Sequence, residues 1–308
     1  ISAMAVHYNA AKTLKKFQVR DAERPVGIQI FGSDIATMAE CARLAEELGA
    51  DIVDINMGCW VPKVCKTGSG AALLKDPDLA EAIVRGVVSA VSVPVTVKVR
   101  AGWDYALYAA PELGRRFEAA GAAAMTLHAR FAKQGFDGTA DWKLIEDLRQ
   151  AITIPLFGNG DVKTPDDAVR LLRESGANGV MVGRAAISNP WSIAAISARL
   201  RGLPEPPPPT IQERLEAGLE LLRGTIAYEA NVDTHNEALQ LGEAAYAQAE
   251  RFAVRRLRGQ LPLFVKGAPG AAQLRNRVTQ CDHLSTVEAA FHDFAQSLAD
   301  SEPSSIDA

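Results

Sequence analysis

Short apolar runs rich in β-branched residues alternate with helical segments through the first 200 residues of the chain. The apolar runs, each a predicted strand, occupy residues 27–31, 52–56, 95–99, 124–128, 155–159 and 179–183. Helix-start patterns lie between them: Asp76-Pro77 and Thr164-Pro165 each place an N-cap residue before a proline at the first helical position. Because apolar strands that alternate with helices pair in parallel and are covered by those helices, the pattern predicts an α/β fold.

Glycines and polar residues cluster at the carboxyl ends of the predicted strands. They are Gly58, Lys98, His128, the run 158–161 and the pair Gly183-Arg184. This placement is typical of a (β/α)8 TIM barrel, which builds its site at that face. A doubly wound open sheet stays the alternative, because it also binds ligands at strand ends. Residues 1–6 are interpreted as the end of a seventh strand, so one βα unit of a barrel is missing from the pattern.

A small all-α domain is predicted to follow the barrel. Four successive prolines, residues 206–209, favour a stiff polyproline II segment. Beyond them the apolar periodicity is helical over residues 211–229, 233–258 and 285–299. The predicted organisation is a barrel domain at 1–201, a linker at 202–210, a helical domain at 211–300 and a disordered tail at 301–308.

Charge, hydropathy and cysteine spacing limit the classes of function. The net charge of −4 gives no overall basic field, so any nucleic-acid binding must rest on a local patch. No apolar run reaches the ~18 residues of a membrane-spanning helix, and we find no signal-peptide pattern. The four cysteines form no C-x-x-C pair, which argues against zinc and against a disulfide framework. We therefore expect a cytoplasmic protein with no membrane association and no metal site.

Cys59 is a candidate catalytic residue. It follows a strand end, Gly58 allows the backbone to turn, and Lys63 and Lys66 lie nearby in sequence. A thiol with the reference pKa of about 8.5 is mostly protonated at neutral pH, so it can serve as an acid as well as a nucleophile. A free cysteine is more often a small buried apolar residue, which stays the alternative here and is our interpretation of Cys65.

The last two predicted strands end in a candidate phosphate site. Asn159, Gly160 and Asp161 follow one strand, and Gly183 and Arg184 follow the next. Barrels commonly bind phosphate at this place through backbone N–H groups and a helix N-terminus, and the Arg184 guanidinium adds a charged fork. Two ordinary strand-to-helix turns are the alternative.

Lys98 and His128 are further candidate site residues. Lys98 interrupts the apolar strand VTVKV, and a buried lysine needs a partner. It could form a Schiff base with a carbonyl substrate or neutralise an anionic ring. His128 ends the next strand, where a histidine is either a structural group or a ligand. Their shared position at strand ends, together with Cys59, favours a single site.

A basic segment in the predicted helical domain favours an anionic partner. Residues 251–281 contain seven positive charges and no acidic residue. The candidate RNA-binding residues in it are Arg255, Arg256, Arg258, Lys266, Arg275 and Arg277. A charge run usually marks a solvated helix face, but the lack of balancing acids makes nucleic acid the leading candidate.

Taken together and in chain order, several stretches resemble the bacterial tRNA-dihydrouridine synthases, closest to their B-type branch. They are DINMGC at 54–59, PKV at 62–64, GSGAALL at 68–74, VTVKVRAGW at 95–103, TLHAR at 126–130, GNGD at 158–161, GRAA at 183–186 and KGAPGAAQLRNR at 266–277. The stretches span nearly the whole chain, and their combination is far more specific than any one of them.

The resemblance implies an FMN-dependent enzyme that uses NADPH to reduce specific uridines in tRNA to 5,6-dihydrouridine. In this family the flavin passes hydride to C6 of uracil and a cysteine delivers a proton to C5, a role that falls here to Cys59. Gln29 and Lys98 would contact the isoalloxazine ring, with His128 near it. The phosphate side would be held by Asn159, Gly160, Asp161, Gly183 and Arg184. The implied partner is tRNA, which the helical domain helps to hold, and no stable protein partner is expected.

Three departures from the family pattern affect these expectations. Trp60 follows the cysteine where the family has proline, and Phe131-Ala132 replace a threonine and an arginine. The segment P-M-A-G of the first strand, which lines the flavin in the family, is absent before Ile1. We therefore expect these 308 residues alone to bind flavin weakly and to associate. Two alternatives stay open: a non-redox barrel aldolase or isomerase that uses Lys98 on a phosphorylated small molecule, and an RNA-binding homologue that has lost catalysis.

Overall fold

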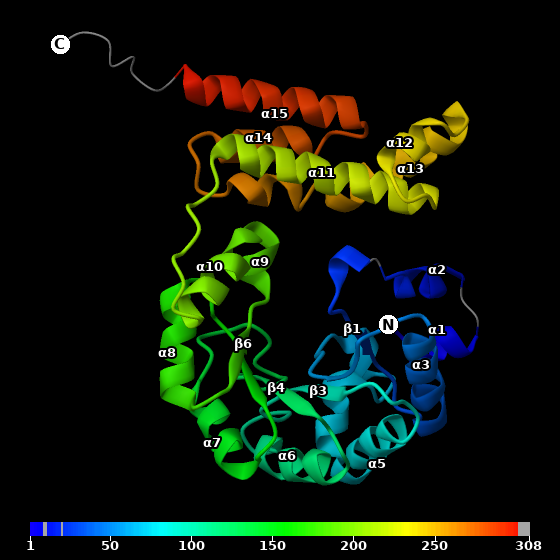
Figure 1. Cartoon of the computed structure of the whole chain (residues 1–308), viewed down its shortest axis with the longest axis vertical. Coiled ribbons are helices and arrows are strands. Elements are labelled where there is room, and N and C mark those ends of the chain that lie inside the picture. Colours follow the sequence, from blue (N-terminus) through cyan, green and yellow to red (C-terminus); the bar gives the residue numbers. More distant parts are fainter. Residues whose placement is uncertain (9–10, 20, 301–308) are drawn as a thin grey trace, which may run out of the picture. The chain divides into compact units, whose positions relative to one another are not determined.

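The structure, a computed structural model, describes residues 1–8, 11–19 and 21–300 of the chain (Figure 1). The chain divides into two compact units, Ile1–Gly183 and Arg184–Ala308. The predicted disordered tail at 301–308 lies outside the described residues.

The first unit contains a six-stranded parallel sheet. Its strands are β1 (Gly27–Ile30), β2 (Ile52–Met57), β3 (Val95–Arg100), β4 (Ala124–His128), β5 (Leu156–Asn159) and β6 (Gly179–Met181). The spatial order is β1-β2-β3-β4-β5-β6, so each strand lies beside its neighbours in sequence. A doubly wound sheet reverses its strand order at a switch point, whereas a (β/α)8 barrel does not. The predicted barrel-type fold is thus confirmed, and the doubly wound alternative is wrong.

Helices follow the strands and cover the outer face of the sheet (Figure 1). They are α3 (Ile35–Glu47), α5 (Pro77–Val88), α6 (Ala110–Ala119), α7 (Lys143–Ala151) and α8 (Pro165–Ser175). The short α4 (Pro62–Cys65) and the 3₁₀ helix η3 (Gly70–Lys75) lie in the segment between β2 and α5. The predicted start patterns are present as hydrogen bonds. The Asp76 side chain accepts from the Leu79 N–H, and Thr164 and Asp167 cap α8 reciprocally.

The two faces of the sheet differ in polarity, because successive residues of a strand point to opposite faces. On the helix-covered face lie fully buried apolar side chains, including Val53, Ile55 and Met57 of β2. On the other face the register aligns polar residues of neighbouring strands in three rows. The rows are Gln29–Asp54–Thr96, Asn56–Lys98–Thr126 and Arg100–His128–Asn159. These polar rows bring the candidate residues of successive strands beside one another.

The chain start differs from the predicted strand over residues 1–6. Ile1 and Ser2 do lie parallel to the end of β1: the Phe31 N–H donates to the Ile1 carbonyl at 2.8 Å, and the Ala3 N–H donates to the Phe31 carbonyl at 3.0 Å. From Ala3 the backbone turns into helix α1 (Ala3–His7), because the Ser2 hydroxyl caps its free N–H groups. The short elements α2 (Ala11–Leu14), η1 (Lys15–Phe17) and η2 (Asp21–Glu23) follow before β1. Only the first two residues therefore behave as a strand end.

The second unit is wholly helical in the residues that the structure describes. Its helices are α9 (Arg184–Ser188), α10 (Trp191–Leu200), α11 (Ile211–Ala230), α12 (His235–Leu239), α13 (Glu243–Leu257), η4 (Leu261–Val265), α14 (Ala271–Val278) and α15 (Leu284–Ala299). Residues 201–210, which include the predicted linker, contain no helix or strand. The predicted helix over 233–258 is two helices, because α12 ends at its C-cap Gln240 and α13 begins after its N-cap Gly242. Helix α14 was not predicted, and α9 and α10 belong to this unit although they fall within the predicted barrel range.

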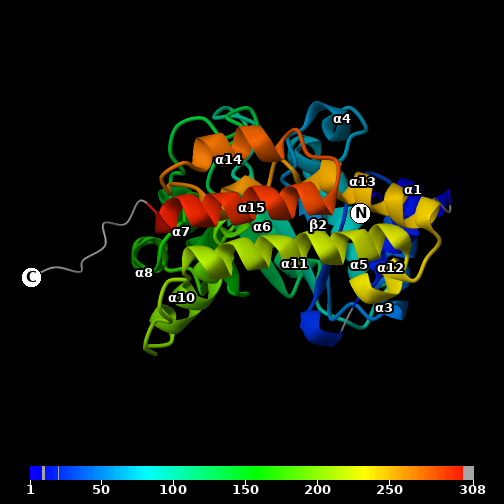
Figure 2. The same cartoon turned by 90° about the horizontal axis from the view of Figure 1, so that it is seen from above.

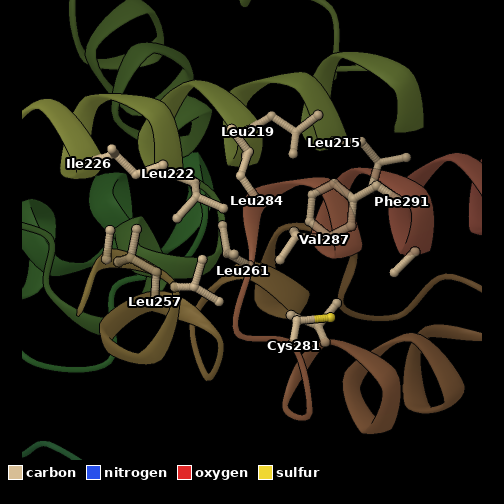
Figure 3. Packing of buried hydrophobic residues seen from close by; sticks show 14 of the residues in the cluster. Leu215, Leu219, Leu222, Ile226, Leu257, Leu261, Cys281, Leu284, Val287 and Phe291 are labelled. Carbon is tan, nitrogen blue, oxygen red and sulfur yellow. The ribbon is translucent and has the colours of Figure 1, made fainter. Parts of the chain in front are cut away.

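An apolar core lies inside the second unit (Figure 3). Helix α11 contributes Leu222 and Ile226, and helix α15 contributes Val287 and Phe291, all of them buried. Helices α11 and α15 run side by side (Figure 2), and α11 also packs on α13. Side chains from η4 and α14 complete the core. Burial of apolar surface from six helical elements, α12 among them, therefore stabilises this unit as a domain with its own core.

Candidate functional site

Cys59 lies in the loop that leaves β2, and hydrogen bonds fix its backbone on both sides. Its N–H and that of Gly58 donate to the Asn56 Oδ1 at 2.9 and 3.1 Å. Its carbonyl accepts from the Ala71 N–H at 2.9 Å and from the Cys65 Sγ at 3.4 Å. Cys59 itself is half-buried, so part of the residue stays exposed while its backbone is held in place.

Gly70 explains the glycine-rich stretch that follows Cys59. It adopts a left-handed φ of +63°, and a Cβ at this position would lie 2.6 Å from the Cys59 carbonyl oxygen. Only glycine satisfies both conditions, so the stretch packs its backbone against the Cys59 loop. The glycine-rich sequence therefore shapes this loop.

Short hydrogen bonds connect polar side chains of β1, β2 and β3. Gln29 donates from Nε2 to an Asp54 oxygen at 2.6 Å, and its Oε1 accepts from the Asn56 Nδ2 at 2.6 Å. The Thr96 hydroxyl donates to the second Asp54 oxygen at 2.6 Å. Burial raises the pKa of Asp54, although the hydrogen bonds from Thr96 and Gln29 and the charge of Lys98 oppose the rise. The Gln29 amide is thus engaged on both sides.

Lys98 lies on the same face of the sheet. It is half-buried, and among the described residues its Nζ forms no hydrogen bond or ion pair. Burial lowers the pKa of Lys98 to about 8; the Asp54 carboxylate opposes this change, and the Arg100 charge adds to it. An anionic ligand would supply the compensation that the charged form of Lys98 lacks.

His128 is buried and neutral. Its Nε2 lies 3.3 Å from the Arg130 Nη1. Because a guanidinium can only donate hydrogen bonds, Nε2 accepts and the ring proton is on Nδ1. Burial, together with the positive charges of Arg100, Lys98 and Arg130, lowers the pKa of His128 to about 3. At neutral pH His128 is therefore a hydrogen-bonding group and no general acid.

Two arginines that the sequence analysis missed anchor the loops around these residues. Arg130 is 1% exposed, and its Nη2 donates to the Asp161 carboxylate at 2.7 Å. Arg100 is also buried, and its Nε donates to the Gly58 carbonyl at 3.1 Å. Each arginine stands two residues after a predicted site residue, so the alternation of strand faces was the pattern that could have identified it.

The candidate phosphate residues of the first unit lie close together. A Cβ on Gly183 would be 4.0 Å from the Asn159 Nδ2, so the two strand ends adjoin. Within the described part of the chain the N–H groups of Gly160 and Gly183 donate no hydrogen bond. Free backbone N–H groups at strand ends suit the oxygens of a phosphate. Arg184, the fifth predicted phosphate residue, begins the second unit.

Asp161 differs from its neighbours in the candidate phosphate site. Its carboxylate accepts from the Arg130 guanidinium at 2.7 Å and from the Ala140 N–H at 2.8 Å. These bonds tie the loop before α7 to the end of β5. The Asp161 side chain therefore has a loop-anchoring role in the structure, which a motif alone does not reveal.

Trp60 and Phe136 form an exposed aromatic edge beside Cys59. Their rings meet edge to face with centroids 6.2 Å apart, and the residues are 38% and 47% exposed. Phe136 also lies 6.0 Å from the His128 ring, which connects this edge to the polar rows of the sheet. Exposed aromatic rings next to a polar site offer a surface on which a planar ligand can stack.

The predicted basic patch of the second unit is largely neutralised by acidic residues from outside 251–281. The ion pairs are Arg255 with Asp282 at 3.0 Å, Arg258 with Asp282 at 3.8 Å, Arg256 with Glu229 at 2.9 Å and Arg277 with Asp293 at 2.6 Å. Lys266 and Arg275 are exposed and have no ion pair among the described residues. Because exposed ion pairs contribute about 0–1 kcal/mol, the paired arginines can exchange their partners for phosphate.

Two further observations concern residues 1–8, 11–19 and 21–300. No helix in these ranges is long and apolar enough to cross a membrane. No group of three or more histidine, cysteine, aspartate or glutamate side chains in these ranges could hold a metal ion.

Comparison with known proteins gives consistent matches. A family model described as dihydrouridine synthase (Dus) matches residues 1–299. A probable tRNA-dihydrouridine synthase 1 of Synechocystis sp. is 37% identical over 285 residues, which are 92% of this chain and 74% of that protein. The tRNA-dihydrouridine synthase B of Xanthomonas campestris pv. campestris is 34% identical over 291 residues, which are 94% of this chain and 82% of that protein.

Other matches cover less of the chain. A probable tRNA-dihydrouridine synthase of Rhizobium leguminosarum bv. phaseoli is 45% identical over 174 residues, which are 56% of this chain and 55% of that protein. Among solved structures, a 2-naphthoyl-CoA reductase complex shares 16% identity over 55% of this chain and 29% of that chain, with a TM-score of 0.42. A likeness that weak carries no argument about function.

Proposed function

This chain belongs to the dihydrouridine synthase family, and from that premise we propose that it reduces uridines in tRNA to 5,6-dihydrouridine. The observation that supports the proposal most strongly is the Cys59 thiol. It is half-buried, its backbone is held by hydrogen bonds on both sides, and it leaves the strand that pairs with the Lys98 strand. A fixed, accessible thiol is what proton delivery to a carbon atom of a bound base requires.

We further propose that the bound cofactor is a flavin, specifically FMN, with NADPH as the hydride donor. The residues present fit such a group. Among the residues that the structure describes, the Lys98 ammonium has no hydrogen bond or ion pair, which suits the anionic end of a reduced ring, and the Gly160 and Gly183 N–H groups donate no hydrogen bond, which suits a phosphate. Gln29 keeps one amide hydrogen and one lone pair beyond its two network bonds, so it can still contact a ring edge.

The chain's own residues would divide the remaining chemistry between them. When bound, the flavin would supply a hydride to C6 of the uracil. Cys59 would give its thiol proton to C5, and the resulting thiolate would recover a proton from solvent. His128, neutral with its proton on Nδ1, would donate a hydrogen bond without transferring that proton. The target uridine must leave its stack to reach Cys59, which is the usual way for enzymes to act on a base.

The proposed partner is tRNA and the proposed location is the cytoplasm. Lys266 and Arg275 of the predicted patch would contact RNA phosphates directly. The paired arginines would exchange their acidic partners for phosphates; they are Arg255, Arg256, Arg258 and Arg277. Such contacts position an RNA without reading its sequence, so the choice of uridine would depend on tRNA shape.

The decisive experiment supplies the purified chain with FMN, NADPH and tRNA transcripts that carry no modification. Mass spectrometry of the digested tRNA should reveal dihydrouridine with the wild type and a loss of at least about a hundredfold in rate with Cys59→Ala, the range of general acid catalysis. Cys65→Ser is the matched control, because it replaces a half-buried thiol but keeps a donor for the Cys59 carbonyl. Equal rates for Cys59→Ala and wild type would refute the assigned role of Cys59, and the absence of product with both would refute the proposed reaction.

One observation favours a second candidate function. The lowered pKa of Lys98, about 8, is also suited to Schiff-base formation, since part of the amine is neutral near that pH. Borohydride treatment in the presence of phosphorylated aldehydes and ketones should leave Lys98 unmodified if the reductase proposal is correct. A stable adduct at Lys98 would support the non-redox aldolase instead.

A further inference from the structure

Three side chains form a continuous line of hydrogen bonds from the interior of the sheet to the backbone of Cys59. Asp54 accepts from the Gln29 Nε2 at 2.6 Å, and the Gln29 Oε1 accepts from the Asn56 Nδ2 at 2.6 Å. The Asn56 Oδ1 then accepts from the Cys59 N–H at 2.9 Å. The line starts on β2, crosses to β1 and returns to β2 just before the loop.

The direction of every hydrogen bond in this line is determined. The Cys59 N–H can only donate, so Asn56 must turn its oxygen toward it and its Nδ2 toward Gln29. Gln29 must then present its oxygen to Asn56 and its Nε2 to Asp54, which must accept. A carboxylate at one end and a backbone N–H at the other therefore impose the same orientation on both amides. Reversal of either amide would set two like groups against each other.

We propose that Asp54 is a positioning residue for Cys59 and acts through the amides of Gln29 and Asn56. The assignment rests on the proposed function only in that Cys59 is taken as the proton donor. Its physical content is separate: Asp54 at one end of the line and the Cys59 N–H at the other together determine which way the Gln29 and Asn56 amides face, and Asn56 holds the Cys59 backbone in place. The Thr96 hydroxyl, which donates to the other Asp54 oxygen at 2.6 Å, holds the carboxylate in place.

The line of hydrogen bonds can contain only one carboxylate, because a carboxylate accepts hydrogen bonds and cannot donate them. Gln29→Glu sets a second carboxylate against Asp54, so one of the two must move and Asn56 loses its orientation. Asp54→Asn alone is tolerated, since its oxygen can face Gln29 while its amide faces the Thr96 hydroxyl, which also accepts. The double variant Gln29→Glu with Asp54→Asn restores a donor at 54 and an acceptor at 29. Asn56 then keeps its wild-type orientation.

The test measures alkylation of Cys59 by iodoacetamide across a range of pH, with the full chain and without flavin, NADPH or tRNA. Trypsin places Cys59 and Cys65 on different peptides, because Lys63 separates them, so mass spectrometry follows each thiol independently. The alkaline plateau of the rate reports access to the sulfur, whereas the midpoint of the pH profile reports nearby charge. In Gln29→Glu, a proton shared between the new carboxyl and Asp54 could replace the hydrogen bond that the Gln29 amide makes. The comparison therefore uses the alkaline plateau, where both carboxyls are least protonated.

We expect the plateau rate of Cys59 to rise at least fivefold in Gln29→Glu, because the loop is released. It should return to within twofold of wild type in the double variant and stay within twofold in Asp54→Asn. Gln29→Met is the matched control: it also breaks the line, but Asp54→Asn should not restore it, since methionine offers no acceptor. In every variant the plateau rate of alkylation should change less at Cys65 than at Cys59.

Each outcome decides the proposal. Rescue of Gln29→Glu but not of Gln29→Met by Asp54→Asn supports it, including the case in which Gln29→Glu alone fails to fold and the double variant folds. A wild-type plateau in Gln29→Glu overturns it, as does a shift in the midpoint alone, which would mean that Asp54 acts only through its charge. A double variant that stays perturbed or unfolded also overturns it. Because no tRNA or cofactor is present, these outcomes are independent of whether the proposed reaction occurs.

Discussion

Loss of the buried guanidinium of Arg130 is the perturbation for which the structure gives the clearest magnitude. Arg130 is 1% exposed and pairs with the Asp161 carboxylate at 2.7 Å, and it also donates to the Gly138 carbonyl at 2.7 Å. Arg130→Met keeps much of the side-chain volume but removes the guanidinium from both acceptors, and Asp161 keeps the hydrogen bond from the Ala140 N–H. Removing one partner of a buried ion pair costs about 3–5 kcal/mol.

The environment of Asp161 places the expected cost near the lower end of that range. Its side chain is 25% exposed, so water can hydrate part of the charge that remains. We therefore expect a loss of about 3 kcal/mol in the free energy of unfolding. For a unit of this size, about 2–4 °C per kcal/mol corresponds to a fall of about 6–12 °C in the melting temperature.

Thermal unfolding followed by circular dichroism tests this value. Arg173→Met is the matched control, because Arg173 is 73% exposed and its ion pair with Glu174 spans 3.8 Å. That variant should change stability by less than about 0.5 kcal/mol. Arg130→Lys keeps the charge without the planar guanidinium, so its melting temperature should lie between those of Arg130→Met and Arg173→Met. If Arg130→Met melts at the temperature of Arg173→Met, the pair with Asp161 does not stabilise the fold and the reasoning is wrong.

Three further predictions follow from other groups. The pKa of Lys98 is about 8 in the folded chain against an ordinary 10.5, so between these pH values the unfolded chain binds more protons and the stability of the wild type should rise with pH. Lys98→Met should therefore be more stable than the wild type in urea unfolding by about 1–3 kcal/mol at pH 7, and this difference should shrink by pH 10. Trp60→Ala should weaken tRNA binding about tenfold in fluorescence titrations, as expected for one stacked base, while Trp60→Phe should keep most of the affinity; equal affinities for all three proteins would exclude stacking on Trp60. Lys266→Ala with Arg275→Ala should reduce the slope of log affinity against log salt by about 1–2, and an unchanged slope would remove both residues from the RNA surface.

The sequence was sufficient where local chemistry determines the result. Alternating apolar strands and proline-led helices predict the parallel sheet, and Asp76 and Thr164 cap the helices as their types require. Cys59, Lys98 and His128 were chosen as candidates because strand ends in such a sheet meet at one edge. The structure adds the register that puts Lys98 beside Asn56, and His128 beside Arg100.

The sequence was insufficient where the result depends on residues far apart in the chain. Residues 251–281 contain no acid, yet Asp282, Glu229 and Asp293 pair with their arginines across helices. The Gln29–Asp54 bond joins residues 25 positions apart, and the Arg130–Asp161 pair joins residues 31 apart. No local pattern encodes such partners, although the alternation of strand faces marks the residues that are available to form them.

Dihydrouridine mapping in the tRNA of cells that lack this protein decides whether the chain reduces uridine in tRNA. The account predicts that dihydrouridine disappears from at least one position, that the wild-type chain restores it, and that Cys59→Ala does not. Unchanged dihydrouridine after deletion, or full restoration by Cys59→Ala, would contradict the account.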